Sequence, residues 1–254
     1  MSTSSWLKTQ AGYFFKRKAP VHIRIARGIL LTTALVASVV EFSPGRSLTA
    51  DEQETVQSVF NDSAPTQDIR IHQSQTADSF MNLLGNHGQA FSDKIFMHSN
   101  VYSHNFIPQY AKNNKHKENK TISADQQDKL FTFLHETAHT WQHAHCFWSM
   151  IGSTTKQALP QLFGSDHSRI ENIYQYTLET NKDLLEYNIE QQASIIAEYY
   201  LLNEYNTPPI MSKNTGNADA LKTLYKSVLK NFLEDPSYIK DRCSTLGRSS
   251  GPNT

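Results

Sequence analysis

The feature that most constrains this chain is a His-Glu-x-x-His motif, His135-Glu136-Thr-Ala-His139. Residues four apart lie on one face of an α-helix, so both histidines can reach a single metal ion. Glu136 lies beside them, where its carboxylate can take a proton from metal-bound water. Apolar residues flank the motif and predict a buried helix: Leu130, Phe131, Phe133, Leu134, Ala138 and Trp141. The motif predicts a catalytic zinc site; the alternative is a core helix whose histidines are satisfied by neighbours.

Length and composition set the frame for such a site. The 254 residues suit one domain, or one domain with an extension. The 24 basic residues balance 24 acidic ones, which argues against a general nucleic-acid binder. The two cysteines, Cys146 and Cys243, are too few for a disulfide scaffold and lack metal-binding spacing. Whether they pair stays open.

The N-terminal 45 residues differ from the rest. A basic segment that includes Lys16 to Lys18 precedes an uncharged run from Gly28 to Val40. Positive charge followed by an apolar run is typical of a signal peptide or a membrane anchor. The run is shorter than the roughly 20 residues of a spanning helix, so a buried or docked helix is the alternative. We expect residues 1–45 to be an extension with 28–40 as a signal or anchor segment. Such a segment places the protein in the cell envelope or outside the cell, and a cytoplasmic location is the alternative.

Residue patterns predict an α+β domain over 46–243, mainly helical, with a small sheet before the motif helix, and a disordered tail over 244–254. The strand over 91–101 is in the right place for an edge strand beside an extended substrate, and an ordinary sheet strand is the alternative. Other elements follow from capping residues and periodicity. They are a helix from Thr49, a strand over 68–72, a helix from Thr76, the motif helix from Ser123 to about His145, a short helix over 156–163, a strand over 172–178, and helices over 186–203 and 217–234.

A catalytic zinc needs a third protein ligand. On a continuous helix His143 lies two turns from His135, about 12 Å away, and Cys146 lies farther, so geometry excludes both. His145 occupies the last position of the metzincin pattern His-Glu-x-x-His-x-x-Gly-x-x-His, with Met211 as a Met-turn candidate. Gln142 stands in place of the helix-breaking glycine and disfavours this alternative.

A later helix offers two carboxylates. Glu190 shares its face with Ala193, Ser194 and Ala197, and such small residues let a second helix approach closely. A carboxylate on such a face needs a partner, which a metal would supply. Glu198, two turns on, is an alternative ligand or a hydrogen-bond partner of a ligating histidine. For either glutamate the alternative is a solvated helix position.

The motif continues as His139-Thr-Trp141-Gln142, and the later helix reads Tyr187-Asn-Ile-Glu190-Gln-Gln-Ala. Together they resemble a bacterial zincin-like group of metallopeptidases and Vgr-related proteins associated with type VI secretion. Looser similarities at 46–52, 59–60 and 69–72 extend the match to about residues 46–205.

The resemblance implies a gluzincin-type Zn²⁺ site with His135, His139 and Glu190 as ligands and Gln142 beside them. It also implies a partner in a secretion system. The sequence departs from the group at residues 1–45, which have no counterpart, and at Ser194, where the group often has an acidic residue.

The expected activity is zinc-dependent hydrolysis of a protein or peptide, with Glu136 moving a proton from the attacking water to the leaving nitrogen. Four residues are candidates for an additional oxyanion donor: His98, His104, Tyr187 and Tyr199. The alternative is a non-catalytic zincin-like binding or assembly module of a secretion or envelope complex. The intact Glu136 argues against that alternative, because a structural zinc needs no general base and is usually closed by four ligands.

Overall fold

The computed structural model describes residues 45–73, 75–84, 87–109, 121–163 and 173–240. The expected signal or anchor segment over 28–40 and the tail over 244–254 lie outside these ranges. No helix within the described ranges has the length and hydropathy needed to span a membrane.

The described chain is α+β, with a small sheet ahead of the motif helix as expected. Four strands form the sheet in the order β1-β2-β4-β3: β1 (Arg46–Ser47), β2 (Arg70–His72), β3 (Gly88–Phe91) and β4 (Lys94–Met97). Strands β2 and β4 are parallel, whereas β1 and β3 each run antiparallel to their neighbour. The helices are α3 (Ala50–Phe60), α4 (Gln75–Leu84), α5 (Ala124–Phe163), α7 (Ile189–Tyr205), α8 (Ala218–Val228) and α9 (Lys230–Glu234).

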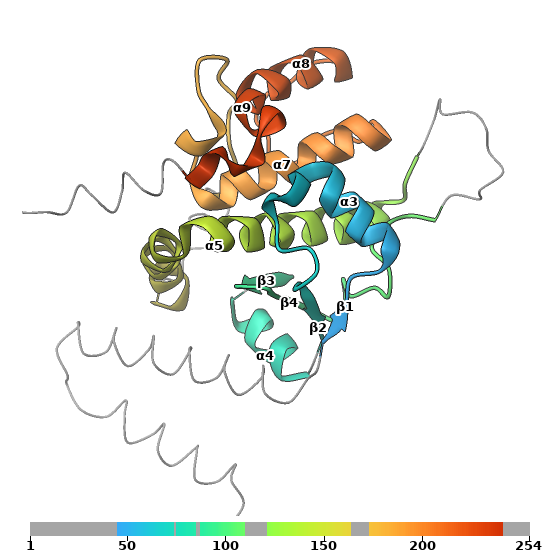
Figure 1. Ribbon diagram of the computed structural model, residues 1–254, viewed down its shortest axis with the longest axis vertical. Helices are drawn as coiled ribbons and strands as arrows, with labels where there is room; N and C mark the ends of the chain where they lie inside the picture. The colour runs from blue at the N-terminus through green and yellow to red at the C-terminus, as the bar shows by residue number, and fades with distance from the viewer. Residues whose placement is uncertain (1–44, 74, 85–86, 110–120, 164–172, 241–254) are drawn as a thin grey trace, which may run out of the picture. The chain divides into compact units, whose positions relative to one another are not determined.

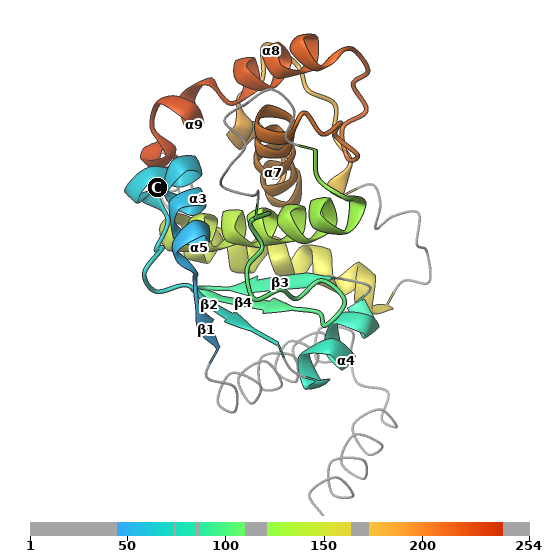
Figure 2. The same ribbon diagram turned by 90° about the vertical axis from the view of Figure 1, so that its right-hand side faces the viewer.

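Helix α5, which carries the motif, runs through the middle of the domain (Figures 1 and 2). The sheet and α4 lie on one side of it, and α7, α8 and α9 lie on the other. Its most extensive contact is with α7, and its next is with β3. The motif helix is therefore covered by the sheet edge on one face and by α7 on the opposite face.

The core around α5 joins the two ends of the described chain. Trp141 contacts Phe60 of α3 and Phe232 of α9, with ring centroids 5.9 and 5.3 Å apart. The indole nitrogen of Trp141 donates to Ser63 Oγ at 2.9 Å and to the Pro236 carbonyl at 3.1 Å. All three aromatic rings are buried. The residue two positions after the motif thus holds α3 and α9 against the motif helix.

The predicted strand over 91–101 was wrong in its limits, and for β4 the alternative of an ordinary sheet strand holds. Two strands occupy this region, and the edge strand beside α5 is β3, whereas β4 lies inside the sheet. The chain reverses at Ser92, whose φ of 58° is in the left-handed region. Hairpin turns usually mark such positions with Asn or Gly, so the Ser-Asp pair here gave no turn signal.

Other boundaries also differ from the expectation. Helix α4 begins at Gln75, so Thr76 is not its cap. The expected strand over 172–178 contributes only an isolated bridge between Tyr176 and Ser212. The expected helix over 217–234 is divided at Leu229 into α8 and α9, and the expected helix over 156–163 is part of α5.

The helical backbone of α5 breaks at Cys146, where φ is −131° and ψ is 36°. Cys146 is disulfide-bonded. Cys243, the second cysteine of the sequence, lies outside the described residues. The break follows His145, so the motif and the six residues after it share one regular helix.

Candidate metal centre

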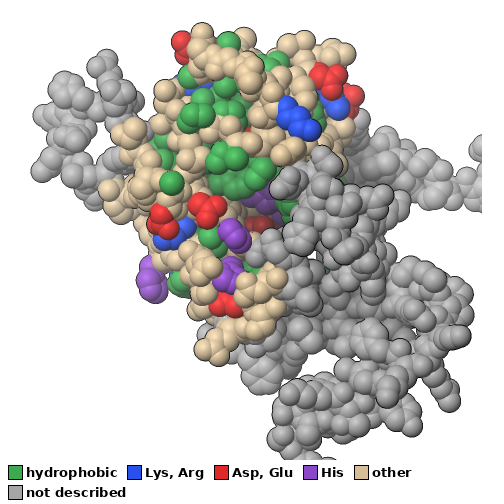
Figure 3. Space-filling view, turned by 180° about the vertical axis from the view of Figure 1, so that it is seen from behind, with side chains coloured by type: hydrophobic (Ala, Val, Ile, Leu, Met, Phe, Trp, Pro, Cys, Tyr) green, Lys and Arg blue, Asp and Glu red, His purple; other side chains and the backbone are tan. Residues whose placement is uncertain are grey.

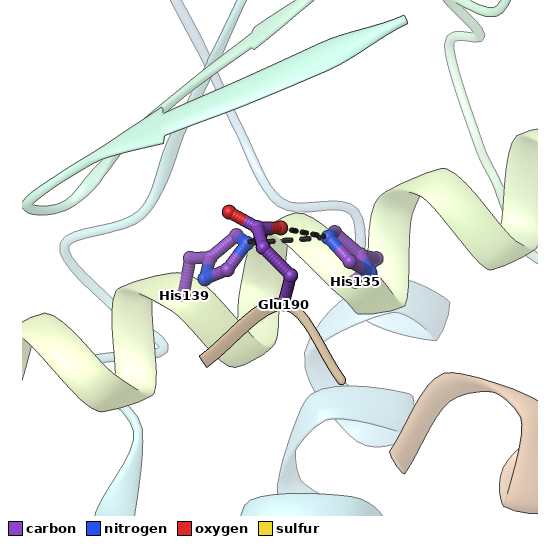
Figure 4. Close-up of side chains that lie close together, drawn as sticks. All are labelled: His135, His139 and Glu190. Carbon is purple, nitrogen blue, oxygen red and sulfur yellow. Dashed lines mark hydrogen bonds and ion pairs between the residues drawn. The ribbon is translucent and has the colours of Figure 1, made fainter. Parts of the chain in front are cut away.

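Three side chains from α5 and α7 meet at one point (Figure 4). The Nε2 atoms of His135 and His139 are 3.2 Å apart. Oε2 of Glu190 lies 3.2 Å from the first and 3.1 Å from the second. Among the described residues, these three form the group whose ligand atoms could hold a metal ion. The structure therefore brings together the three residues predicted as ligands, and their metal-binding role stays a prediction.

The spacing of these three atoms fits a small tetrahedral cation. Ligands bound at about 2 Å in a tetrahedral arrangement lie roughly 3.3 Å from one another. The three atoms form a nearly equilateral triangle with sides of 3.1–3.2 Å. Two imidazoles and one carboxylate are also a known ligand set of catalytic zinc, which leaves a fourth position for water or substrate.

The start of α7 positions Glu190. Asn188 is the N-cap: its side chain accepts from the backbone N–H of Gln191, whose side chain accepts from the Asn188 backbone. Glu190 therefore lies in the first turn, where the helix dipole favours a negative charge. One turn later, Ala193 and Ser194 are fully buried. These small side chains let α7 approach α5 closely enough for the Glu190 carboxylate to reach both imidazoles.

The second ring nitrogen of each histidine also has a partner. Nδ1 of His135 lies 3.3 Å from Ser194 Oγ, and Nδ1 of His139 lies 2.8 Å from Gln142 Oε1. The amide nitrogen of Gln142 donates to the Ile189 carbonyl and to Gln192 Oε1. The Gln142 oxygen must therefore accept from His139, which places the proton of the neutral ring on Nδ1 and leaves the Nε2 lone pair for a metal.

Electrostatics at the triad favour a positive charge between its members. Burial by itself lowers the pKa of His139, but the Glu190 carboxylate outweighs this effect and raises that pKa to about 9. Burial raises the pKa of Glu190, yet the two imidazoles hold it well below its usual range. A proton between His139 and Glu190 is therefore stabilised, and a metal ion that binds both groups must displace that proton.

Glu136 lies beside the triad and is buried. Burial raises the pKa of its carboxyl group, while His139, His135 and the Ala90 backbone N–H partly offset that rise. Its Oε2 has no hydrogen-bond partner within the described structure. A buried carboxylate oxygen without a partner costs free energy of folding unless a ligand or a proton binds to it. A raised pKa also suits a proton acceptor that works near neutral pH.

The other proposed ligands lie elsewhere. His145 Nε2 is 2.7 Å from the Ser63 carbonyl and 2.9 Å from Ser63 Oγ, so the structure does not bring it to the triad. The regular helix through Gln142 explains this, because no glycine turns the chain back. His143 packs near Phe91 of β3, with ring centroids 6.4 Å apart. Glu198 bonds neither histidine; it accepts from the backbone N–H groups of Ile210 and Met211.

A cleft of about 370 Å³ opens beside His135 and Glu136. Histidine and acidic side chains are visible there in a hollow bordered by hydrophobic side chains (Figure 3). None of the four expected oxyanion donors lines this cleft: His98, His104, Tyr187 and Tyr199.

Tyr174, which sequence reasoning missed, lines the cleft, and its ring centroid is 5.9 Å from that of His135. Burial raises the pKa of its hydroxyl, and the Glu190 and Glu136 carboxylates raise it further, so Tyr174 stays protonated. It is a hydrogen-bond donor next to the triad. The sequence signals were an aromatic residue before the Glu190 helix and the predicted strand over 172–178 that contains it.

No protein-family model matches the sequence. The type VI secretion system spike protein VgrG2b of Pseudomonas aeruginosa is 34% identical over 100 residues, which are 39% of this chain and 8% of that protein. The chain thus spans a small part of the relative's length. Among solved structures, the effector domain of Pseudomonas aeruginosa VgrG2b covers 84% of this chain and 97% of its own, with 21% sequence identity and a TM-score of 0.49.

Proposed function

We propose that the protein is a zinc-dependent metallopeptidase with a zincin-like domain, in which His135, His139 and Glu190 hold the metal. The observation that carries this proposal is the buried Oε2 of Glu136, which has no hydrogen-bond partner among the described residues and lies beside a set of two imidazoles and one carboxylate. A structural metal site has no use for such a carboxylate, whereas hydrolysis needs a base there. When bound, the metal supplies Lewis-acid polarisation of the scissile carbonyl and lowers the pKa of water.

The side chains of the cleft have separate parts in this mechanism. Glu136 takes the proton of the attacking water and delivers it to the leaving nitrogen. Burial raises the proton affinity of Glu136, which suits both steps. The Tyr174 hydroxyl, beside His135, donates a hydrogen bond to the oxygen on which negative charge develops. Strand β3, the sheet edge next to α5, offers backbone groups to an extended substrate.

The test compares wild type with Glu136→Gln after loading with zinc. Both proteins should hold one zinc per chain by elemental analysis, because the Glu136 side chain is not among the three ligands. Wild type should cleave an unfolded protein such as reduced casein, and Glu136→Gln should lose at least about 100-fold in rate. Equal activity of the two proteins would eliminate Glu136 as the base.

A second candidate is a non-catalytic module of a secretion system, which the similarity to a type VI secretion spike protein favours. We propose a secretion-system partner on the same ground. In that case zinc-loaded wild type would cleave no unfolded protein, and Glu136→Gln would retain the same partner in a pull-down with a type VI spike protein. Cleavage that depends on Glu136 would decide for the enzyme, and such an enzyme can still be carried by a spike.

A further inference from the structure

The cleft continues from the metal centre to an apolar wall made by Leu201 of α7 and by Pro208, Pro209, Ile210 and Met211 of the following loop. The Ile210 residue is 72% exposed. Few large hydrophobic residues of the described structure are exposed to solvent. An exposed apolar residue inside a cleft gains free energy when a ligand covers it. The wall is continuous with the site where the proposed chemistry occurs.

The loop that forms this wall is held rigidly. Asn206 ends α7 in the left-handed conformation, with φ 54° and ψ 29°, which turns the chain back along the helix. The backbone N–H of Thr207 then donates to the Leu201 carbonyl at 3.3 Å. Pro208 and Pro209 have fixed φ angles, so the segment before Ile210 loses little further freedom when a ligand binds.

A buried carboxylate fastens the far end of the wall. Glu198, 2% exposed, accepts with Oε1 from the N–H groups of Ile210 and Met211 at 2.5 and 2.7 Å. Its Oε2 accepts from the hydroxyls of Tyr176 and Tyr225 at 2.5 and 3.2 Å. Both oxygens are therefore satisfied by donors, and two of these donors belong to the wall.

The same anchor joins the wall to the segment that carries Tyr174. The backbone N–H of Tyr176 donates to the Met211 carbonyl at 3.2 Å, and Lys213 N–H donates to the Tyr176 carbonyl at 2.8 Å. Tyr176 is two residues after Tyr174, which lines the cleft beside His135. Glu198 thus fixes the wall and the Tyr174 segment in one arrangement, which sets the distance between the apolar wall and the metal centre.

We propose that the apolar wall is a specificity subsite for one large aliphatic or aromatic side chain of the peptide substrate, adjacent to the scissile bond, and that Glu198 is its positioning residue. The proposal rests on the proposed peptidase function, because it takes a peptide as the occupant. A rigid, preformed wall discriminates by contact area, so a peptide with alanine at the matching position binds more weakly.

The first experiment maps cleavage sites of the zinc-loaded full chain on a mixture of unfolded proteins. One position flanking the scissile bond should be enriched in Leu, Ile, Met and Phe. A peptide with Leu at that position should be cleaved with a kcat/KM at least about tenfold above its Ala analogue. Cleavage without an apolar preference overturns the subsite and leaves the peptidase proposal standing. A zinc-loaded protein that cleaves nothing overturns the peptidase proposal, and the subsite falls with it.

The second experiment assigns the preference to the wall. Ile210→Ser should lower kcat/KM about tenfold for the Leu peptide and less than twofold for the Ala peptide. Leu233→Ser is the matched control, since Leu233 is 44% exposed and does not line the cleft. It should leave both values unchanged. An equal loss for the two peptides in Ile210→Ser, or an equal effect of the control, overturns the assignment.

The third experiment measures binding without turnover and tests Glu198. On the zinc-loaded Glu136→Gln protein, calorimetry should show tighter binding of the Leu peptide than of the Ala peptide, and adding Ile210→Ser should remove the difference. Glu198→Gln, in the active protein, should raise KM for the Leu peptide more than for the Ala peptide and leave the zinc content unchanged. Tyr225→Phe keeps the carboxylate and removes one donor, so it should have a smaller effect of the same kind. A Glu198→Gln protein with wild-type KM overturns the positioning role.

Discussion

At the scale of single residues, Gln142 links the two helices of the metal centre. Its oxygen accepts from His139, and its nitrogen donates to two acceptors on α7, the Ile189 carbonyl and Gln192 Oε1. One amide therefore sets the tautomer of a ligand and also fastens the helix that brings Glu190. A glycine at this position, as the metzincin pattern has, would provide none of these three bonds.

Gln142→Ala should weaken zinc binding by about 10–100-fold while leaving the protein folded, as is typical when the hydrogen-bond partner of a metal-bound histidine is removed. The measurement is competition with a chromogenic chelator at fixed pH. Gln57→Ala, at an exposed position on α3, serves as the control and should not change the zinc affinity. An unchanged affinity in Gln142→Ala would mean that α7 alone orients His139.

Glu190→Ala and His145→Ala should separate the two sequence-based alternatives for the third ligand. Glu190→Ala removes one of three donor atoms within 4.8 Å of one another, so we expect a loss of zinc affinity of more than about 100-fold. His145→Ala removes bonds to Ser63 and should retain full zinc content. Elemental analysis after dialysis checks both. Zinc loss in His145→Ala with retention in Glu190→Ala would restore the metzincin alternative.

The residues of the centre differ in how well the sequence predicts them. His135, Glu136 and His139 are four residues or fewer apart on one helix, so local periodicity is enough to place them together. Glu190 is distant in sequence from the motif. The small residues beside it favour Glu190 as the third ligand, but they do not exclude the other candidates. Tyr174 belongs to the segment predicted as a strand over 172–178, which forms an isolated bridge instead. Contacts distant in sequence place it beside His135: Tyr176 bonds the 211–213 loop, and Asn188 and Gln191 at the start of α7 donate to the carbonyls of Ile173 and Gln175.

At the level of helices and strands, the contact between β3 and α5 fixes the position of Glu136, the proposed base. A Cβ atom at Gly88 would lie 2.8 Å from Glu136 Cγ and 3.0 Å from both Glu136 Oε1 and Thr132 Cγ2. The strand can lie this close to the motif helix only because residue 88 has no side chain. The sequence predicted a strand near this position, but it gave no sign of the Ser92 turn and so no sign of which strand is at the edge.

Gly88→Ala should therefore move β3 or rotate Glu136, at a cost of about 1–3 kcal/mol in the free energy of unfolding. We expect zinc content to be retained and peptidase activity to fall by more than about tenfold, because a displaced base is poorly aligned with the attacking water. Urea unfolding, elemental analysis and a casein assay measure the three quantities. Gln89→Ala on the same strand is the control. Wild-type activity in Gly88→Ala would show that β3 does not position the base.

At the level of the whole molecule, an ion pair between Arg46 and Glu52 holds the first strand of the described domain to its core. Arg46 of β1 donates to both oxygens of Glu52 at 2.7 and 2.8 Å, and also to the Ser103 carbonyl at 2.8 Å. Glu52 is fully buried and also accepts from the backbone N–H of Phe106 at 3.0 Å. The boundary near residue 46 is a prediction from the order of basic and apolar residues before it and from the family resemblance, and it stays a prediction; Arg46 itself forms an ion pair with the core. Composition could not show that Arg46 has a buried partner, because that partner depends on the packing of α3 against the 103–106 loop.

The ion pair between Arg46 and Glu52 limits how far the chain can be shortened from its N-terminus. A chain that starts at Ser43 keeps Arg46, so it should retain the zinc content and the urea midpoint of the full chain. A chain that starts at Leu48 loses Arg46 and leaves the Glu52 carboxylate buried without its cation, which should lower the free energy of unfolding by about 3–5 kcal/mol. Arg46→Ala in the chain that starts at Ser43 removes the same charge without shortening β1 further, and it should reproduce most of that loss. If the chain that starts at Ser43 is itself unfolded or metal-free, residues 1–42 contribute to the core and the export or anchoring role of that segment is wrong.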